Sequence, residues 1–253
     1  MNDRAAGPVE RAAGSPARGT APGAGYVREM FARVAPRYDL LNHLLSLNID
    51  RFWRSRVARR FRAVLARPGA RVLDLCCGTG DLALALGGKG PASVIGADFC
   101  HPMLERAAGK LGQARMPVLL VEADALRMPF PDSSFDLVTS AFGFRNLADY
   151  DTGLREMFRL LRPGGQIGVL EFAEPPGRLL APLYGFYFRH VLPKVGGAIS
   201  GDPGAYTYLP ASVEKFPSPE ELTGWMGEAG FQEVEFQRFT GGVACLHTGR
   251  RAQ

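Results

Sequence analysis

The first segment with a regular pattern of apolar residues predicts helices. Between residues 26 and 67, apolar side chains recur at steps of three and four positions, the spacing of one helical face. In the first part of this segment they are Met30, Phe31, Val34, Tyr38, Leu41, Leu44, Leu45 and Leu47. Pro36 interrupts the pattern, so we expect a short helix on either side of it. A third helix is expected over 51–65.

Beyond residue 70 the pattern changes to short apolar runs that alternate with amphipathic segments. The runs expected to form strands are 71–77, 93–99, 118–125, 135–143 and 166–173. Helices are expected from residue 81, over 102–111 and over 149–161. This alternation predicts an α/β fold, a mostly parallel sheet with helices on both faces. In such sheets, ligands bind at the carboxyl ends of the strands.

The last part of the chain predicts an antiparallel hairpin. After a helix over 219–229, two apolar runs, 231–239 and 242–250, are joined by Thr240-Gly241-Gly242. Glycines at a short connection between such runs are typical of hairpin turns. The segment 175–217 is longer than the roughly dozen residues that a crossover needs, so we interpret it as an insertion.

Composition limits the class of protein. The 253 residues have a net charge of +5, which suits an anionic membrane surface or nucleic acid without deciding between them. No run approaches the ~18 apolar residues that span a bilayer. The four cysteines show neither zinc spacing nor a disulfide framework, so we expect a cytoplasmic protein without a metal site.

The turn after the first strand carries the clearest chemical signal. The apolar run Val72–Leu75 is followed by Cys76-Cys77-Gly78-Thr79-Gly80. A dinucleotide-binding loop would read G-x-G-x-x-G at this place, and this turn does not. Further polar or small residues follow the other strands, namely Asp98, Asp124 and Ser140 to Phe142. These turns are expected to meet at one edge of the sheet.

A parallel sheet closed by a C-terminal hairpin resembles the class I S-adenosylmethionine-dependent methyltransferases. Their loop reads D/E-x-G-x-G-x-G, and here Asp74 begins the match and Cys76 replaces the first glycine. The segments YDLLNHLLSLNIDRFWR (38–54), FGFRN (142–146) and RLLRPGGQIGVLEF (159–172) are similar to the ubiquinone/menaquinone biosynthesis C-methyltransferases, and the similarity extends over 26–251. Many members of that family have a histidine where this chain has Asp50.

The resemblance implies a site for S-adenosylmethionine. Its residues are Cys77, Gly78, Thr79, Gly80, Asp98, Asp124, Ala125, Ser140 and Ala141. Glycines let the backbone approach the amino-acid end of the methyl donor, where Thr79 offers its hydroxyl and N–H to the methionyl carboxylate. Asp98 accepts bonds from the ribose hydroxyls. Asp124 and the Ala125 N–H meet the adenine, the alternative for Asp124 being a turn cap.

The resemblance also implies a reaction, methyl transfer to a ring carbon of a prenylated hydroquinone, with demethylmenaquinol as the preferred acceptor. A general base can raise the nucleophilicity of the ring. His190 and Asp202, in the insertion, are the candidates for this catalytic role, although a single histidine is more often structural. The other titratable groups that we considered are His43, His101, His247, Asp39 and Glu171.

Other functions stay open from the sequence. One is C-methylation of the benzoquinol intermediate of ubiquinone biosynthesis, and another is methylation of a different small molecule. An NAD(P)-dependent oxidoreductase would need the dinucleotide loop that is absent here. A non-catalytic adaptor would be expected to lose pocket residues, whereas Gly78, Gly80, Asp98 and Asp124 are all present.

We expect one domain over 26–253, preceded by a disordered tail over 1–25 that is rich in Ala, Gly, Pro, Arg and Ser. The domain comprises a helical cap, a cofactor-binding core, a lid insertion, and a terminal helix with its hairpin, over 26–67, 68–174, 175–217 and 218–251. The segments 26–48 and 178–212 are expected to form a lid over the prenyl chain.

The expected partners are the prenylated quinol and a membrane surface, without nucleic acid. Arginines are expected to contact anionic headgroups around the mouth of the site, namely Arg145, Arg189 and those of 51–62. The same arginine-rich helix is also read as an amphipathic cover with a solvated basic face. For the aromatic insertion, the alternative is the interface of a homodimer.

Overall fold

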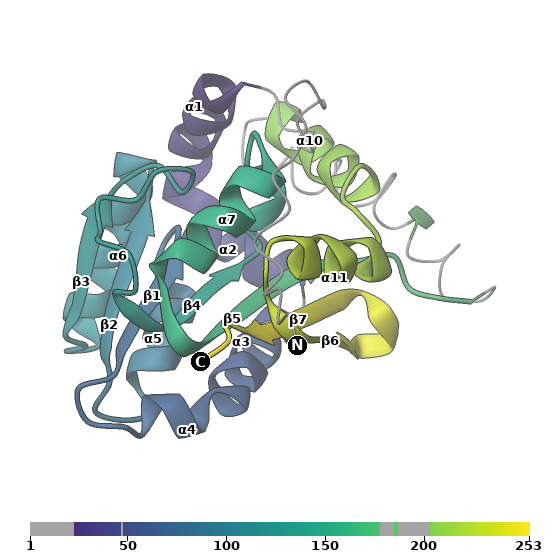
Figure 1. The fold of residues 1–253 in the computed structure, drawn as a ribbon. Coiled ribbons are helices and arrows are strands. Elements are labelled where there is room, and N and C mark those ends of the chain that lie inside the picture. The colour runs from purple at the N-terminus through teal and green to yellow at the C-terminus, as the bar shows by residue number, and fades with distance from the viewer. Residues whose placement is uncertain (1–22, 47, 178–184, 187–202) are drawn as a thin grey trace.

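A seven-stranded sheet forms the centre of the molecule (Figure 1). The computed structural model describes residues 23–46, 48–177, 185–186 and 203–253. The strands are β1 (Arg71–Leu75), β2 (Ser93–Asp98), β3 (Val118–Glu122), β4 (Phe135–Ala141), β5 (Leu161–Phe172), β6 (Gln232–Phe239) and β7 (Ala244–Arg250). Their order is β3-β2-β1-β4-β5-β7-β6. The pairs β5–β7 and β6–β7 are antiparallel and the other described pairs are parallel, so the expected parallel sheet with a terminal hairpin is confirmed.

Helices cover both faces of this sheet. The α-helices are α1 (Ala24–Val34), α2 (Tyr38–Leu45), α3 (Ile49–Arg60), α4 (Arg62–Leu65), α5 (Asp81–Gly87), α6 (His101–Gln113), α7 (Tyr150–Leu160), α10 (Pro203–Glu214) and α11 (Pro219–Glu228). Short 3₁₀ turns are η1 (Ala35–Arg37), η2 (Phe144–Asn146) and η4 (Thr240–Gly242). No described helix is both long and apolar enough to cross a membrane.

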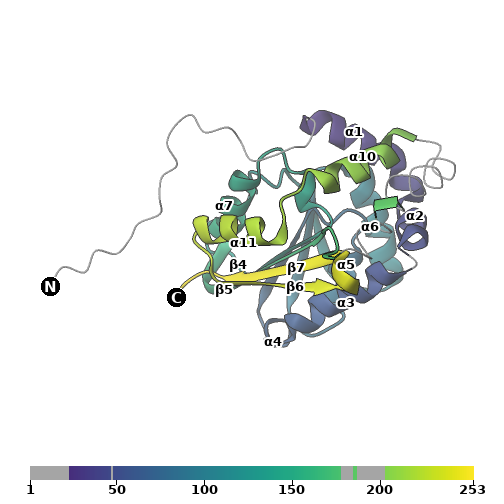
Figure 2. The same ribbon diagram turned by 90° about the vertical axis from the view of Figure 1, so that its right-hand side faces the viewer.

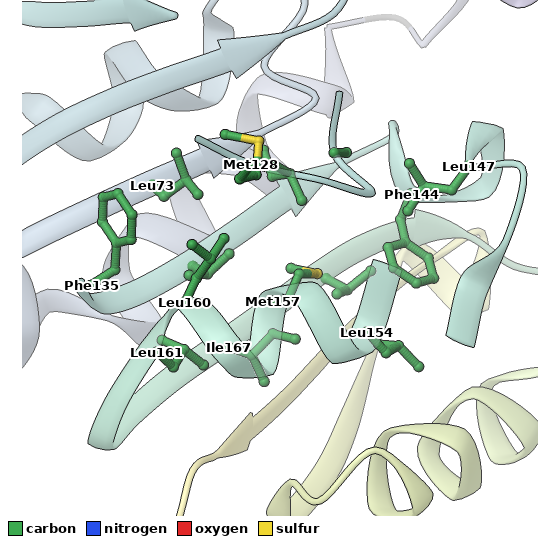
Figure 3. Packing of buried hydrophobic residues seen from close by; sticks show 14 of the residues in the cluster. Leu73, Met128, Phe135, Phe144, Leu147, Leu154, Met157, Leu160, Leu161 and Ile167 are labelled. Carbon is green, nitrogen blue, oxygen red and sulfur yellow. The ribbon is translucent and has the colours of Figure 1, made fainter. Parts of the chain in front are cut away.

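Alternating side chains along the strands build one hydrophobic cluster on each face. In β1, Leu73 and Leu75 belong to the cluster beneath α7 and α11, which also contains Leu154 and Met157 of α7. Figure 3 shows Leu73, Leu154 and Met157 among its side chains. Val72 points the other way, into the cluster beneath α3, α4 and α5. Truncating a fully buried leucine such as Leu73 to alanine typically costs about 2–5 kcal/mol. These two clusters hold the ends of the strands in fixed positions.

The third helix differs from the expectation of one continuous helix over 51–65. It ends at Arg60, and α4 begins only at Arg62. Phe61 lies between them with non-helical dihedral angles, φ −97° and ψ 15°. Its ring is buried against Gly168 of β5, where a Cβ atom would stand 2.5 Å from the ring. The helix therefore breaks because the aromatic ring packs directly on the sheet.

The first part of the segment 26–67, comprising α1, η1 and α2 and called the cap from here on, lies at one end of the molecule (Figure 1). Pro36 lies in η1 and separates α1 from α2, as the sequence predicts. Figures 1 and 2 both show α1 beside α10 at this end, with α4 at the opposite end. A small apolar cluster joins the cap to α6, and it consists of Val34, Ala35, Cys100 and Met103. The cap thus stands over the carboxyl ends of the strands.

Candidate active site

A cavity opens where four parallel strands end beneath the cap. It is lined by the turns after β1, β2, β3 and β4, with Phe31 and Tyr38 contributed by the cap. Its volume is about 970 Å³, including the part that is open to solvent. The strand order changes direction at β1, between β2 and β4, and open α/β sheets bind ligands at this switch point. The cavity therefore lies where the fold predicts a site.

Most of the residues predicted to bind the cofactor line this cavity. They are Cys77, Gly78, Thr79, Asp98, Asp124, Ala125 and Ala141. Gly80 and Ser140 are not in its lining. Gly80 instead starts α5 with φ 82°, close to Ala107 of α6. The Ser140 hydroxyl is buried without a hydrogen-bond partner among the described residues. The contacts that each residue makes with a ligand stay predictions.

Asp98 holds the glycine turn in shape. Its Oδ2 accepts the Gly78 N–H at 2.8 Å, and its Oδ1 accepts the Cys100 N–H at 2.9 Å. Burial raises the pKa of Asp98, although these backbone donors oppose the shift. Gly78 has φ 53°, and a Cβ atom built on it would meet no atom within 4 Å. Its free side faces space that a ligand can approach closely.

Thr79 is already engaged by the cap. Its hydroxyl donates to Asp39 Oδ1 at 2.5 Å and accepts from Lys110 Nζ at 3.2 Å. Lys110 also lies 2.6 Å from a carboxylate oxygen of Asp39 and 2.6 Å from one of Asp81. A hydroxyl carries one proton, so a ligand carboxylate would have to displace Asp39 to receive it.

Asp124 lies just beyond the end of β3 and is exposed. Its Oδ1 accepts the Leu126 N–H at 2.9 Å, which is the turn cap that the sequence left as an alternative. This bond occupies one lone pair of a carboxylate that has four, so it does not prevent a contact with an adenine amino group.

Asp74 begins the loop motif, and the sequence assigned it no role, yet it lines the cavity. The side chain is buried, its Oδ2 has no partner among the described residues, and its Oδ1 lies 3.4 Å from the Thr139 hydroxyl. Burial raises its pKa to about 7, against the opposing charge of Arg54. The acidic first position of the motif was the signal that could have identified it.

Arg145 contradicts its sequence-based placement at a membrane surface. The side chain is buried, and it donates to Glu171 Oε2 at 2.9 Å and to the Phe142 carbonyl. The Arg145 backbone N–H also reaches Glu171 Oε1 at 3.0 Å. Arg145 therefore fixes the turn after β4 to the end of β5. Asn146 in the same turn lines the cavity and accepts the Tyr208 hydroxyl at 3.0 Å.

The arginines predicted for the third helix include both buried and exposed side chains, a difference that the sequence did not reveal. Arg54 is buried, lines the cavity and forms an ion pair with Asp50. Arg59, Arg60 and Arg62 are exposed, but they lie at or beside α4, at the end of the molecule opposite the cap (Figure 2). These three do not surround the mouth of the cavity, and for Arg51, exposed at the start of α3, the contact with headgroups stays a prediction. Arg189 lies outside the described residues.

The predicted catalytic residues His190 and Asp202 lie outside the described residues, and their role stays a prediction. The other candidates have structural partners. His101 is exposed beside Glu122, and buried His247 lies 3.0 Å from the Pro219 carbonyl. Burial, together with Asp98 and Asp74, raises the pKa of the Cys76 and Cys77 thiols well above the usual value. Both thiols are therefore protonated and poor nucleophiles.

Three potential metal ligands cluster beside the cavity. Ligand atoms of His43, Asp50 and Asp81 lie within 4.8 Å of one another. Asp50 is already paired with Arg54, and Asp81 with Lys110. These cations neutralise the carboxylates. We therefore interpret the cluster as an ion-pair network that joins the cap to α5 and α6.

The chain resembles proteins of one family along most of its length. The profile of the ubiE/COQ5 methyltransferase family matches residues 20–251. A demethylmenaquinone methyltransferase of Thermus thermophilus is 52% identical over 223 residues, which cover 88% of this chain and 100% of that protein. The ubiquinone/menaquinone biosynthesis C-methyltransferase UbiE of Geobacter sulfurreducens is 43% identical, over 89% of this chain and 88% of that protein.

Solved structures support the fold independently. A SAM-dependent methyltransferase of Aquifex aeolicus superposes with a TM-score of 0.57 at 18% identity, covering 78% of this chain and 88% of that one. At this identity the match concerns the fold alone, whereas the sequence matches extend over the cap, the cavity and the terminal hairpin. The chain therefore belongs to the ubiE/COQ5 methyltransferase family.

Proposed function

We propose that this protein transfers the methyl group of S-adenosylmethionine to a ring carbon of demethylmenaquinol, yielding a menaquinol. The observation that carries the proposal is the 52% identity with a demethylmenaquinone methyltransferase over that protein's whole length. The cavity agrees with it, because the glycine turn and Asp98 occupy one part while the turn after β4 occupies another. A donor and an acceptor ring can therefore meet in one enclosure.

The transfer needs an in-line approach more than it needs acid–base chemistry. A carbon of the electron-rich hydroquinol ring forms a bond to the methyl group as the bond from sulfur to that methyl breaks, leaving S-adenosylhomocysteine. The ring carbon then loses its proton. Holding two reactants in near-attack geometry can supply about 7–11 kcal/mol of the barrier. The residues around the cavity therefore contribute chiefly by orienting the reactants and excluding water.

The acceptor end is built from apolar and hydrogen-bonding groups. Phe142 lines it with its ring 4.6 Å from that of Phe172, and Asn146 lies beyond. Burial raises the pKa of Tyr38, although the nearby Arg145 opposes the shift, so its hydroxyl is neutral at physiological pH. A neutral phenol and an amide can hydrogen-bond to the two ring oxygens of a hydroquinol. We infer that Tyr38 and Asn146 orient the ring.

The test uses purified full-length protein, S-adenosylmethionine with a deuterated methyl group, and a chemically reduced short-chain demethylmenaquinol. We expect a menaquinol that carries the label, detected by mass spectrometry, together with S-adenosylhomocysteine. The matched acceptor is the demethylated benzoquinol of the ubiquinone pathway. Labelling of the benzoquinol alone would reject the preferred acceptor, and failure to bind S-adenosylmethionine in a calorimetric titration would reject methyl transfer itself.

A strain that lacks the gene gives an independent answer. We expect its extracted quinones to contain demethylmenaquinone in place of menaquinone. Normal menaquinone with an accumulated demethylated benzoquinone would assign the protein to the other pathway.

We also propose that the cap end contacts a membrane surface. Five large apolar side chains are exposed among the described residues, and four lie on α1, α2 and α3 or in the insertion, namely Tyr26, Leu40, Phe52 and Phe186. A polyprenyl substrate resides in lipid, so apolar side chains near the mouth would shorten its path. Flotation with anionic vesicles should recover the protein, and Leu40→Ser with Phe52→Ser should reduce recovery. Leu119→Ser, on β3, is the matched control.

The lid over 26–48 and 178–212 and the homodimer stay predictions. Part of the lid segment lies outside the described residues. Light scattering at two protein concentrations measures the oligomeric state directly. A dimer that dissociates on Phe186→Ala without a kinetic change would favour the interface over the lid.

A further inference from the structure

The charges around the cavity are unequal. Its described lining contains four carboxylates, those of Asp74, Asp81, Asp98 and Asp124. The same lining contains a single cationic side chain, that of Arg54. The methyl donor of the proposed reaction carries two positive groups, the sulfonium and the ammonium, and one negative group, the methionyl carboxylate. The cavity therefore offers one cation for the one anionic group of the ligand.

Arg54 is held in place from one side. It projects from α3 and is 7% exposed, and one of its terminal nitrogens, Nη1, pairs with Asp50 Oδ2 on the preceding turn. Asp50 in turn accepts the Ser46 hydroxyl at 2.7 Å and lies 3.0 Å from His43 Nδ1. Burial would raise the pKa of Asp50, yet these bonds and Arg54 hold it below its usual value. Asp50 is thus an ionised anchor.

The other side of Arg54 has room for a partner. Its Nη2 forms an ion pair with Asp81 Oδ2 at 3.9 Å, which is too long for a hydrogen bond and leaves its N–H donors available. A guanidinium has five N–H donors in a planar fork that matches a carboxylate in two places. The guanidinium also lies over the Phe142 ring, 5.3 Å from its centre, which restricts its movement.

Other groups near the glycine turn are less able to bind a carboxylate. The Thr79 hydroxyl gives its proton to Asp39, and Lys110 already pairs with Asp39 and Asp81. We propose that the guanidinium of Arg54 binds the methionyl carboxylate of S-adenosylmethionine, with Asp50 as the residue that positions it. This inference rests on the proposed function and adds a donor-binding residue from α3 to those of the sheet.

The test compares two ligands that differ in one group. S-Adenosylmethionine and its decarboxylated form share adenine, ribose, sulfonium and amine. Replacing Arg54 alone would strand a buried carboxylate, so the principal variant is Asp50→Asn with Arg54→Met, which removes the pair together. Circular dichroism and thermal unfolding first establish that this double variant is folded, and calorimetry then measures both dissociation constants on the same preparation.

We expect the wild type to bind S-adenosylmethionine roughly 10- to 100-fold more tightly than its decarboxylated form. The double variant should lose most of this preference. Its affinity for S-adenosylmethionine should fall, while its affinity for the decarboxylated ligand should change little. Asp50→Asn alone, which keeps the guanidinium, should retain a preference, and Arg54→Lys should retain part of it.

An equal loss for both ligands would overturn the assignment and show that the pair only supports the cap. An unchanged preference in the double variant would also overturn it. If the wild type binds neither ligand, the proposed function itself fails, a result that differs from both of these.

Discussion

The two walls of the cavity are built by different forces. The sheet wall, defined as the turns after β1 to β4, rests on two large hydrophobic clusters and on backbone bonds such as that from Gly78 to Asp98. The cap wall, defined as α1, η1 and α2, meets α6 through a small apolar cluster, and Val27 and Met30 of α1 are buried outside that cluster. Ion pairs among the described residues also attach it, such as Arg28 with Glu122 and Lys110 with Asp39.

This difference assigns different tasks to the two walls. Buried apolar clusters resist salt and hold atoms in fixed positions, whereas partly exposed ion pairs are weak and are screened by salt. The sheet wall can therefore keep a permanent shape for the donor. We expect the cap wall, which covers the cavity, to open at lower cost, as a site that must admit two substrates requires.

The largest expected effect concerns the free-energy cost of ionising Asp74, which is buried in the sheet wall. The pKa of Asp74 is raised from 3.8 to about 7 by burial. Because its pKa is higher in the folded protein, Asp74 keeps its proton more readily there than in the unfolded chain. Its contribution to folding is therefore most favourable below about pH 4 and is lost as the pH rises towards 7. Asp74→Asn removes the ionisable group. The free energy of unfolding of the ligand-free variant, relative to that of the wild type, should therefore increase by on the order of 3 kcal/mol between pH 4 and pH 8.

Denaturant unfolding of both proteins at several pH values measures this gain. Asp136→Asn, which alters a half-buried carboxylate at the opposite end of β4 that is paired with Arg162, is the control. A constant difference between Asp74→Asn and wild type across this range would contradict the prediction.

The second effect tests the donor contacts of the sheet wall. Asp98→Ala removes the carboxylate that shapes the glycine turn and faces the cavity. We expect S-adenosylmethionine binding to weaken roughly 100-fold, because bonds to a charged group contribute about 1.5–3 kcal/mol each. The fold should persist, since burial makes this carboxylate costly to ionise.

Gly78→Val should abolish binding by a different route. The added side chain fills the open space at the turn and strains a residue with φ 53°. Because this wall depends on packing and backbone geometry, neither loss should vary much with salt. Calorimetry at low and high ionic strength checks both variants, and unchanged dissociation constants would contradict the position of the site.

The residues at the strand ends were largely predictable from the sequence, and the partners of the charged side chains were not. Apolar runs locate strand ends to within a few residues, and parallel strands bring their ends together, so Gly78, Asp98 and Asp124 could be grouped without a structure. The prediction depended on the period of the apolar residues and on the rule for ligand sites in open sheets.

Arginines show why the rest could not be predicted. Arg54 and Arg59 are five positions apart in a basic helix, yet one is buried in the cavity and the other is exposed. A charge pattern cannot distinguish solvent from a polar cavity, since both accept arginine. Arg145 was likewise misplaced because its partner, Glu171, is distant in sequence and meets it only through the pairing of β4 with β5.

The third effect concerns the inner attachment of the cap. Asp39→Ala removes the acceptor of the Thr79 hydroxyl and one partner of Lys110. We expect S-adenosylmethionine to bind roughly 3- to 10-fold more weakly, because the cap then covers the donor less of the time. Amide exchange over 24–45 should accelerate, while exchange in β1 and β4 should not. Tighter binding would instead mean that Asp39 competes with the ligand for Thr79.

The smallest effect belongs to the outer attachment. Arg28 donates to Glu122 at 2.7 Å, but the two side chains are 53% and 39% exposed. Exposed pairs of this kind contribute about 0.2–1 kcal/mol at low salt and less as ions screen them. Arg28→Ala should therefore weaken S-adenosylmethionine binding by about twofold at low ionic strength and not measurably at high ionic strength. Arg28→Lys, which keeps the charge, should restore most of the difference. A loss from Arg28→Ala that equals that of Asp39→Ala and persists in high salt would mean that α1 is held by packing, like the sheet wall, and the distinction between the two walls would fail.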